Sequence, residues 1–200
     1  MTAKINKETV KHAAPYAIAA AAVASAGLWL WQKTRTGLPK GVIPITDFDA
    51  GRYLGQWYEI ARFDYRFEKG LKNVTAHYLK SSDGTIKVIN RGQDGYSGEW
   101  EESTGKAKFV SDEHTGRLKV SFFGPFYAAY TIMAIDDNYQ YALIAGNDLE
   151  YLWLLSREPS MPEDIKADYL KRAAAVGYDI NRLLWTKQNQ ADDLSIPTVS

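Results

Sequence analysis

The sequence predicts an all-β fold: an eight-stranded, up-and-down antiparallel barrel with a C-terminal α-helix, preceded by an N-terminal hydrophobic helix. Three observations lead to this prediction. From Tyr53 to Arg157, short β-like runs are divided by turn signals at intervals of roughly 8 to 12 residues. One helical pattern follows these runs, and a long uncharged stretch precedes them. The 200 residues suffice for one such domain and do not require a second core.

Residues 1–31 are predicted to be a signal peptide or a signal anchor. The stretch from Ala13 to Trp31 carries no charge and is about long enough to cross a ~30 Å bilayer core as a helix. Ala22-Val23-Ala24 resembles a cleavage site, whereas the tryptophans at the end of the stretch suit a retained anchor, so both alternatives stay open. Either segment would deliver the rest of the chain to the cell envelope, facing the periplasm, membrane-associated or secreted.

Residues 32–47, with two glycines and two prolines, are predicted to be a linker. Residues 48–188 form the predicted barrel domain, and the polar residues 189–200 a disordered tail. Apolar and polar residues alternate clearly from Arg117 to Phe122, which indicates a strand with one buried face. The predicted strands are about 55–66, 72–81, 85–92, 98–111, 117–124, 126–136, 139–146 and 150–157.

The C-terminal helix is predicted after these strands. Ser160 and Glu163 have the spacing of a capping box, and Gly177 fits the end of the helix. The stripe that should pack on the outside of the barrel is Ile165, Tyr169, Ala173 and Val176. A last strand is predicted from about Asp179 to Lys187.

Three short motifs resemble the sequence signatures of the lipocalin family: Gly55-x-Trp57 in GQWYEIAR, the turn Asp136-Asp137-Asn138-Tyr139 before YALIAG, and Arg157 in LWLLSREP. The similarity runs from about Phe48 to Trp185 and is closest to the bacterial lipocalins and their apolipoprotein D-like relatives. It implies a structural closed end made by Gly55, Trp57, Asp137 and Arg157, where the arginine stacks on the indole as a cation–π contact of ~1 to 2 kcal/mol. The sequence departs from the acylated bacterial members, because the cysteine that they require is missing.

A lipocalin barrel is usually hollow, so the resemblance implies that apolar side chains line a lipid site. Ordinary core packing is the alternative for each of them. The expected lipid-binding residues are Phe63, Tyr78, Val88, Trp100, Phe109, Phe122, Tyr127, Tyr141 and Trp153, with Tyr151 in the same aromatic set. Arg66, Lys69 and Lys72, near the expected mouth, form a basic rim for an anionic head group, or else are solvated loop charges.

Composition argues against several other functions. The 24 basic and 24 acidic residues cancel, so no overall field attracts nucleic acid. The absence of cysteine removes a thiol nucleophile and cysteine-bound metals. His12, His77 and His114 show no metal-ligand spacing, and neither a metal nor a cofactor is expected.

The favoured function is a non-catalytic, lipid-binding lipocalin that stores or transports fatty acids or lysophospholipids at a membrane. The N-terminal segment would attach it to that membrane, and a homodimer is compatible with the sequence. The alternative is a lipocalin-fold enzyme, an isomerase or epoxidase acting on a lipid or pigment. Recovery of unchanged labelled lipid after incubation would favour the carrier, and turnover would favour the enzyme.

Overall fold

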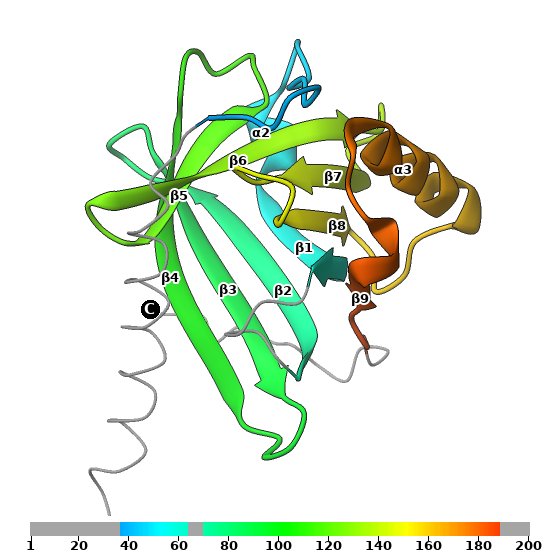
Figure 1. Ribbon diagram of the computed structural model, residues 1–200. Coiled ribbons are helices and arrows are strands. Elements are labelled where there is room, and N and C mark those ends of the chain that lie inside the picture. Colours follow the sequence, from blue (N-terminus) through cyan, green and yellow to red (C-terminus); the bar gives the residue numbers. More distant parts are fainter. Residues whose placement is uncertain (1–36, 64–69, 189–200) are drawn as a thin grey trace, which may run out of the picture.

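A computed structural model describes residues 37–63 and 70–188 of the chain (Figure 1). The predicted leader 1–31, the predicted tail 189–200, and both Arg66 and Lys69 lie outside the described residues. Within the described ranges, no helix is long and apolar enough to cross a membrane.

The described elements follow the predicted order, with a short helix before the first strand. The helices are α2 (Ala50–Tyr53) and α3 (Glu163–Val176), and a 3₁₀ turn, η1, spans Ile180–Arg182. The strands are β1 (Gly55–Phe63), β2 (Leu71–Lys80), β3 (Ile86–Asp94), β4 (Trp100–Phe109), β5 (Arg117–Phe123), β6 (Phe126–Ile135), β7 (Tyr141–Ala145), β8 (Leu152–Ser156) and β9 (Leu183–Trp185).

Eight strands close into the predicted antiparallel barrel. Each of β2 to β7 pairs with the next strand in the chain, and β1 pairs with both β8 and β2, which closes the ring. Short β9 adds to β1 beyond the point where β1 pairs with β2. In Figure 1, β2, β3 and β4 extend well past β7 and β8, so the wall of the barrel is uneven in height. The all-β, up-and-down architecture is confirmed.

Two apolar clusters stabilise this architecture. The interior cluster takes residues from all eight barrel strands, which places it inside the ring: its buried members are Phe48, Tyr53, Trp57, Tyr78, Ile86, Val88, Ala107, Leu118, Ile132, Tyr139, Ala142, Ile144 and Leu155. The helix-side cluster joins α3 to the outer face of the neighbouring strands, and its members include Ile60, Phe63, Leu143, Leu154, Tyr169 and Ala173. The stripe predicted on the helix does pack on the outside of the barrel.

The start of α3 differs from the predicted capping box. Pro162 occupies the N-cap position, and no side chain caps the helix. Glu163 instead forms an ion pair with Lys166, one turn along the helix. The Ser160 carbonyl accepts a hydrogen bond from the Ser156 hydroxyl at 2.8 Å, which fixes the loop before the helix. Gly177 ends the helix in the left-handed conformation, at φ 109°, as predicted.

Part of the segment expected to be a linker packs against the barrel. Val42 and Leu38 contact the helix-side cluster, and Ile45 contacts the interior cluster. The Ile45 amide donates to the Ile132 carbonyl at 3.0 Å, and its own carbonyl accepts from the Gly116 amide at 2.9 Å. The chain therefore enters the barrel along a hydrogen-bonded path that covers one end.

Arg157 organises the closed end. Its guanidinium carbon lies 3.9 Å from the centre of the Trp57 indole ring. The same guanidinium donates to the carbonyls of Arg52 at 2.7 Å, Leu54 at 2.9 Å and Gln56 at 2.6 Å. The Arg52 and Leu54 carbonyls lie at the end of α2, where helix geometry leaves the last carbonyls without partners of their own, and Gln56 lies at the start of β1.

Gly55 and Asp137 also contribute to this end. Gly55 has a φ of 93°, in the left-handed region where a side chain would be strained, and a Cβ atom there would touch Nη1 of Arg157 at 3.4 Å. The Asp137 carbonyl accepts a hydrogen bond from Nη2 of Arg52 at 2.7 Å. The Arg52 guanidinium carbon in turn lies 4.2 Å from the centre of the Tyr139 ring.

Trp57→Ala should lower the free energy of unfolding by ~3 to 5 kcal/mol, because it empties a fully buried aromatic site. The matched control is Trp185→Ala, since Trp185 is 47% exposed and its loss should cost less than about 1 kcal/mol. Urea unfolding of both variants measures the difference. Equal losses would show that the closed end does not depend on Trp57.

Candidate functional site

The barrel interior is the candidate site, and tyrosines form the part of it next to the closed end. The hydroxyl oxygen of Tyr130 lies 2.6 Å from that of Tyr53 and 2.8 Å from that of Tyr78. The Tyr53 ring packs 4.9 Å from the ring of Trp57, so this hydroxyl group cluster stands directly on the closed end. The interior is therefore aromatic, with polar atoms paired among themselves.

These tyrosines remain neutral over the physiological range. Burial raises the pKa of Tyr78 to about 12. Burial likewise raises the pKa of Tyr53 and of Tyr130 well above the usual value. A phenol with a raised pKa is a poor general base near neutral pH, because it holds its proton tightly. The cluster suits hydrogen bonding to a ligand better than acid–base chemistry.

A second polar group in the interior is an ion pair. Nη1 of Arg62 donates to Oε1 of Glu59, and the Thr186 hydroxyl donates to the same carboxylate oxygen at 2.5 Å. Arg62 is 0% exposed and Glu59 5%, so both charges are removed from water. The side chain of Gln188 adds hydrogen bonds to the carbonyls of Glu59 and Val74 at 2.8 and 2.9 Å, which fastens the end of the domain between β1 and β2.

A bulge in β1 explains why Arg62 points inward. Directly opposed residues of an antiparallel pair share a face. Glu59 opposes Leu155 and Arg62 opposes Trp153, both of the interior cluster, while Ala61 opposes outward-facing Leu154. The register shift between Glu59 and Ala61 thus exchanges the faces of the residues that follow.

Five of the residues expected to bind lipid do lie in or against the interior cluster: Tyr78, Val88, Phe109, Phe122 and Trp153. Tyr78 and Val88 are buried, at 5% and 2% exposure. The other three are only partly buried, so part of each side chain faces open space.

Four expected lining residues lie elsewhere, and their placement corrects the sequence prediction. Phe63 faces the helix side, where its ring centre is 5.9 Å from that of Tyr178, because the β1 bulge turns it outward. Tyr141 also faces the helix side, and its carbonyl accepts from the Tyr169 hydroxyl at 2.9 Å. Tyr151, in the same aromatic set, is buried at 6% exposure and packs 6.2 Å from the ring of Trp153.

Trp100 and Tyr127 are on the outer surface. The guanidinium carbon of Arg91 lies 4.3 Å from the centre of the Trp100 ring, and Trp100 is 40% exposed. The Tyr127 ring lies under the ammonium groups of Lys108 and Lys119. Long cationic side chains cover these outward-facing rings. Their aromatic character in the sequence therefore did not show that they lie outside the barrel.

Only Lys72 of the expected basic rim is described. It is half-buried near the start of β2 and lies opposite Gln93 of β3. Its charge contributes to the lowering of the pKa of Asp94, which is caused mainly by hydrogen bonds from the Ser97 and Tyr96 amides. The other end of β2 pairs with the part of β1 that contains Trp57. Lys72 therefore lies toward the end of the barrel opposite to the closed end.

The sequence analysis missed four interior residues: Tyr53, Glu59, Arg62 and Tyr130. Glu59 could have been found, because it is in phase with Trp57 on an alternating strand. Arg62 could not, since the bulge that turns it inward leaves no sequence signature. Across the described residues, no three histidine, aspartate or glutamate side chains gather as metal ligands.

Residues 48–188 match the family described as a lipocalin-like domain. The chain is 51% identical over 150 residues to the outer membrane lipoprotein Blc of Citrobacter freundii, covering 75% of this chain and 85% of that protein. It is 32% identical over 157 residues to mouse apolipoprotein D, covering 74% and 80%. Insecticyanin of the tobacco hornworm Manduca sexta has the same fold, with a TM-score of 0.62, 20% identity, and coverage of 78% and 91%.

Glu59→Gln should lower the free energy of unfolding by about 3 kcal/mol, because it deprives a buried guanidinium of its carboxylate. Replacing both partners, as Glu59→Gln with Arg62→Met, should restore most of that loss, since no buried charge is then left. Chemical unfolding of the two variants provides the test. A double variant as unstable as the single one would mean that the pair does not act as a unit.

Proposed function

Because the chain belongs to the lipocalin family, we propose that it is a carrier that binds a fatty acid or a lysophospholipid inside the barrel, without chemistry. The observation that carries the proposal is a barrel with an aromatic interior that is sealed at one end by Trp57 and Arg157. An acyl chain placed there would gain ~0.8 kcal/mol for each buried methylene, before the costs of ordering.

The relatives support a place in the bacterial cell envelope. Relatives from Citrobacter freundii and Escherichia coli are named outer membrane lipoproteins, at 51% and 48% identity. We infer that the barrel of this chain faces the periplasm beside a membrane. Residues 1–31 would supply the attachment, because the sequence offers no cysteine for an acyl chain.

The polar groups of the interior support a ligand with a polar portion. Glu59 and Arg62 follow Trp57 along β1, on the side away from the closed end, and each forms a hydrogen bond with Thr186. An ion pair that is already satisfied can still accept or donate to a ligand oxygen, as the neutral tyrosine hydroxyls can. The basic residues Arg66, Lys69 and Lys72 remain part of the proposal as the rim that receives an anionic head group.

Titration with fatty acids and lysophospholipids of increasing chain length tests the carrier. Chains longer than about ten carbons should bind with a Kd below ~100 μM and be recovered unchanged. Binding should change the emission of Trp153, which lies against the interior, so Trp153→Phe should remove most of the signal. Trp100→Phe, on the outer face, is the matched control and should leave the signal intact. No binding by any chain would contradict the proposal.

Lys72→Glu should weaken binding of an anionic fatty acid about two- to fivefold, as expected for one partly screened charge, and leave a neutral monoacylglycerol unaffected. Lys171→Glu makes the same charge change on an exposed position of α3 and should alter neither affinity. Equal losses for the anionic and the neutral ligand would remove Lys72 from the head-group rim.

A further inference from the structure

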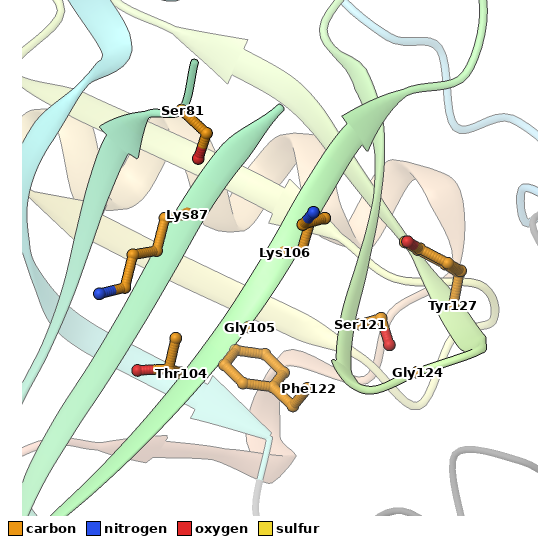
Figure 2. Close-up of a pocket in the computed structure, with 9 residues that line it drawn as sticks. All are labelled: Ser81, Lys87, Thr104, Gly105, Lys106, Ser121, Phe122, Gly124 and Tyr127. Atoms are coloured by element: carbon orange, nitrogen blue, oxygen red, sulfur yellow. The ribbon is translucent and has the colours of Figure 1, made fainter. Parts of the chain in front are cut away.

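The outer wall of the barrel contains a hollow whose polar lining the carrier function does not use. It has a volume of about 450 Å³ and lies over β3, β4 and β5 (Figure 2). Lys87 of β3 is paired with Lys106 of β4, and both line it. Their sequence neighbours Val88 and Ala107 belong to the interior cluster, so strand alternation directs the two lysines outward.

The apolar part of the hollow forms where a glycine on β4 leaves room for a phenylalanine ring on β5. A Cβ atom at Gly105 would lie 2.8 Å from Cδ1 of Phe122, so only glycine leaves room for that ring. Figure 2 shows the Phe122 ring beside Gly105. The described pairing of β4 with β5 runs from Phe109 to Lys106 and stops just before this point. The ring, which also packs against the interior cluster, therefore presents an apolar surface to the hollow where the described ladder ends.

A buried hydroxyl at the same place has no partner. Ser121 is 6% exposed, and its Oγ makes no hydrogen bond within the described structure. It lines the hollow beside Phe122. An unsatisfied buried hydroxyl costs ~1 to 3 kcal/mol, so its retention calls for a partner that the folded chain does not supply.

Positive charge gathers around this hydroxyl. Lys108 and Lys119 place their ammonium groups 5.7 and 5.4 Å from the centre of the Tyr127 ring, at the side of the hollow. Lys106 forms an ion pair with Asp83 at 3.0 Å, which offsets one of the charges. Lys87, Lys108 and Lys119 have no such ion pair with a described carboxylate, so three cationic side chains lie in or beside the hollow.

We propose that the hollow is a second binding site, on the outer wall of the barrel, that takes the phosphate group of an amphipathic ligand such as a phospholipid head group. Lys87 and Lys106 supply cationic donors to the phosphate oxygens, and the Ser121 and Thr104 hydroxyls supply neutral ones. A phosphate has enough oxygens to accept from all of them. The apolar portion of the ligand lies against Phe122.

Full-length protein, titrated with glycerol 3-phosphate and with vesicles of phosphatidylcholine with or without phosphatidylglycerol, tests the proposal. Two variants alter the site: Lys87→Glu and Ser121→Ala. Two matched controls make the same kinds of change elsewhere. Lys171→Glu reverses an exposed charge on α3, and Thr131→Val removes another buried hydroxyl without a partner in the described structure, at a residue that is 0% exposed.

Ser121→Ala should weaken phosphate binding about fivefold, as the loss of one ordinary hydrogen bond does, while the protein unfolds no more easily. Lys87→Glu should weaken it about tenfold or more, because an attractive charge becomes a repulsive one. Lys171→Glu and Thr131→Val should leave binding unchanged. If Ser121→Ala binds as Thr131→Val does, or Lys87→Glu as Lys171→Glu does, the site is overturned.

The two probes distinguish the source of the phosphate. Binding of anionic vesicles alone assigns the site to a lipid head group, and binding of glycerol 3-phosphate assigns it to the phosphate itself; binding of neither overturns the proposal. Fatty-acid binding inside the barrel should be unchanged in Lys87→Glu and Ser121→Ala. If the unmodified protein does not bind fatty acids, the carrier function is contradicted, and the titration with the phosphate probes still tests the outer site separately.

Discussion

The contact between Arg157 and Trp57 is the constraint on which the rest of the structure depends. The Arg157 guanidinium covers the face of the Trp57 indole and donates hydrogen bonds to the carbonyls of Arg52 and Leu54 at the end of α2. It joins the last barrel strand, the first barrel strand and the segment before it at a single point. At that end, the Tyr53 ring packs against the Trp57 ring, so the tyrosine cluster lies directly on the closed end.

The chain must satisfy two apolar environments at once, one inside the barrel and one beneath α3. Strands β7 and β8 are buried on both faces for this reason, which is why Leu143 and Ile144 belong to different clusters. Strands β3 and β4 have no helix over them and carry lysines outward instead. The helix thus covers the outer face on one side of the barrel and leaves the lysines of the opposite wall exposed.

Strand alternation was a sound guide where a strand is regular and solvent covers one face. From Arg117 to Phe122 it indicated one buried face, and Leu118, Val120 and Phe122 do lie in or against the interior cluster. It failed at Phe63, because a bulge in β1 shifts the phase, and at Tyr141, because the outer face there is as apolar as the inner one. It also could not separate Trp100 from the interior aromatics, since an arginine from the neighbouring strand covers its ring.

The sequence by itself determined the barrel, the helix that follows it and the motifs of the closed end, because these depend on local periodicity and on a few residues at strand ends. Only the tertiary structure decided which side chains meet: Arg62 with Glu59 and Thr186, and Tyr130 with two other tyrosines, whereas the Ser121 hydroxyl meets no partner among the described residues. The physical reason is that register shifts and closure of the ring bring together residues far apart in the chain. No local pattern encodes the separation of two side chains that lie more than a hundred residues apart, as Glu59 and Thr186 do.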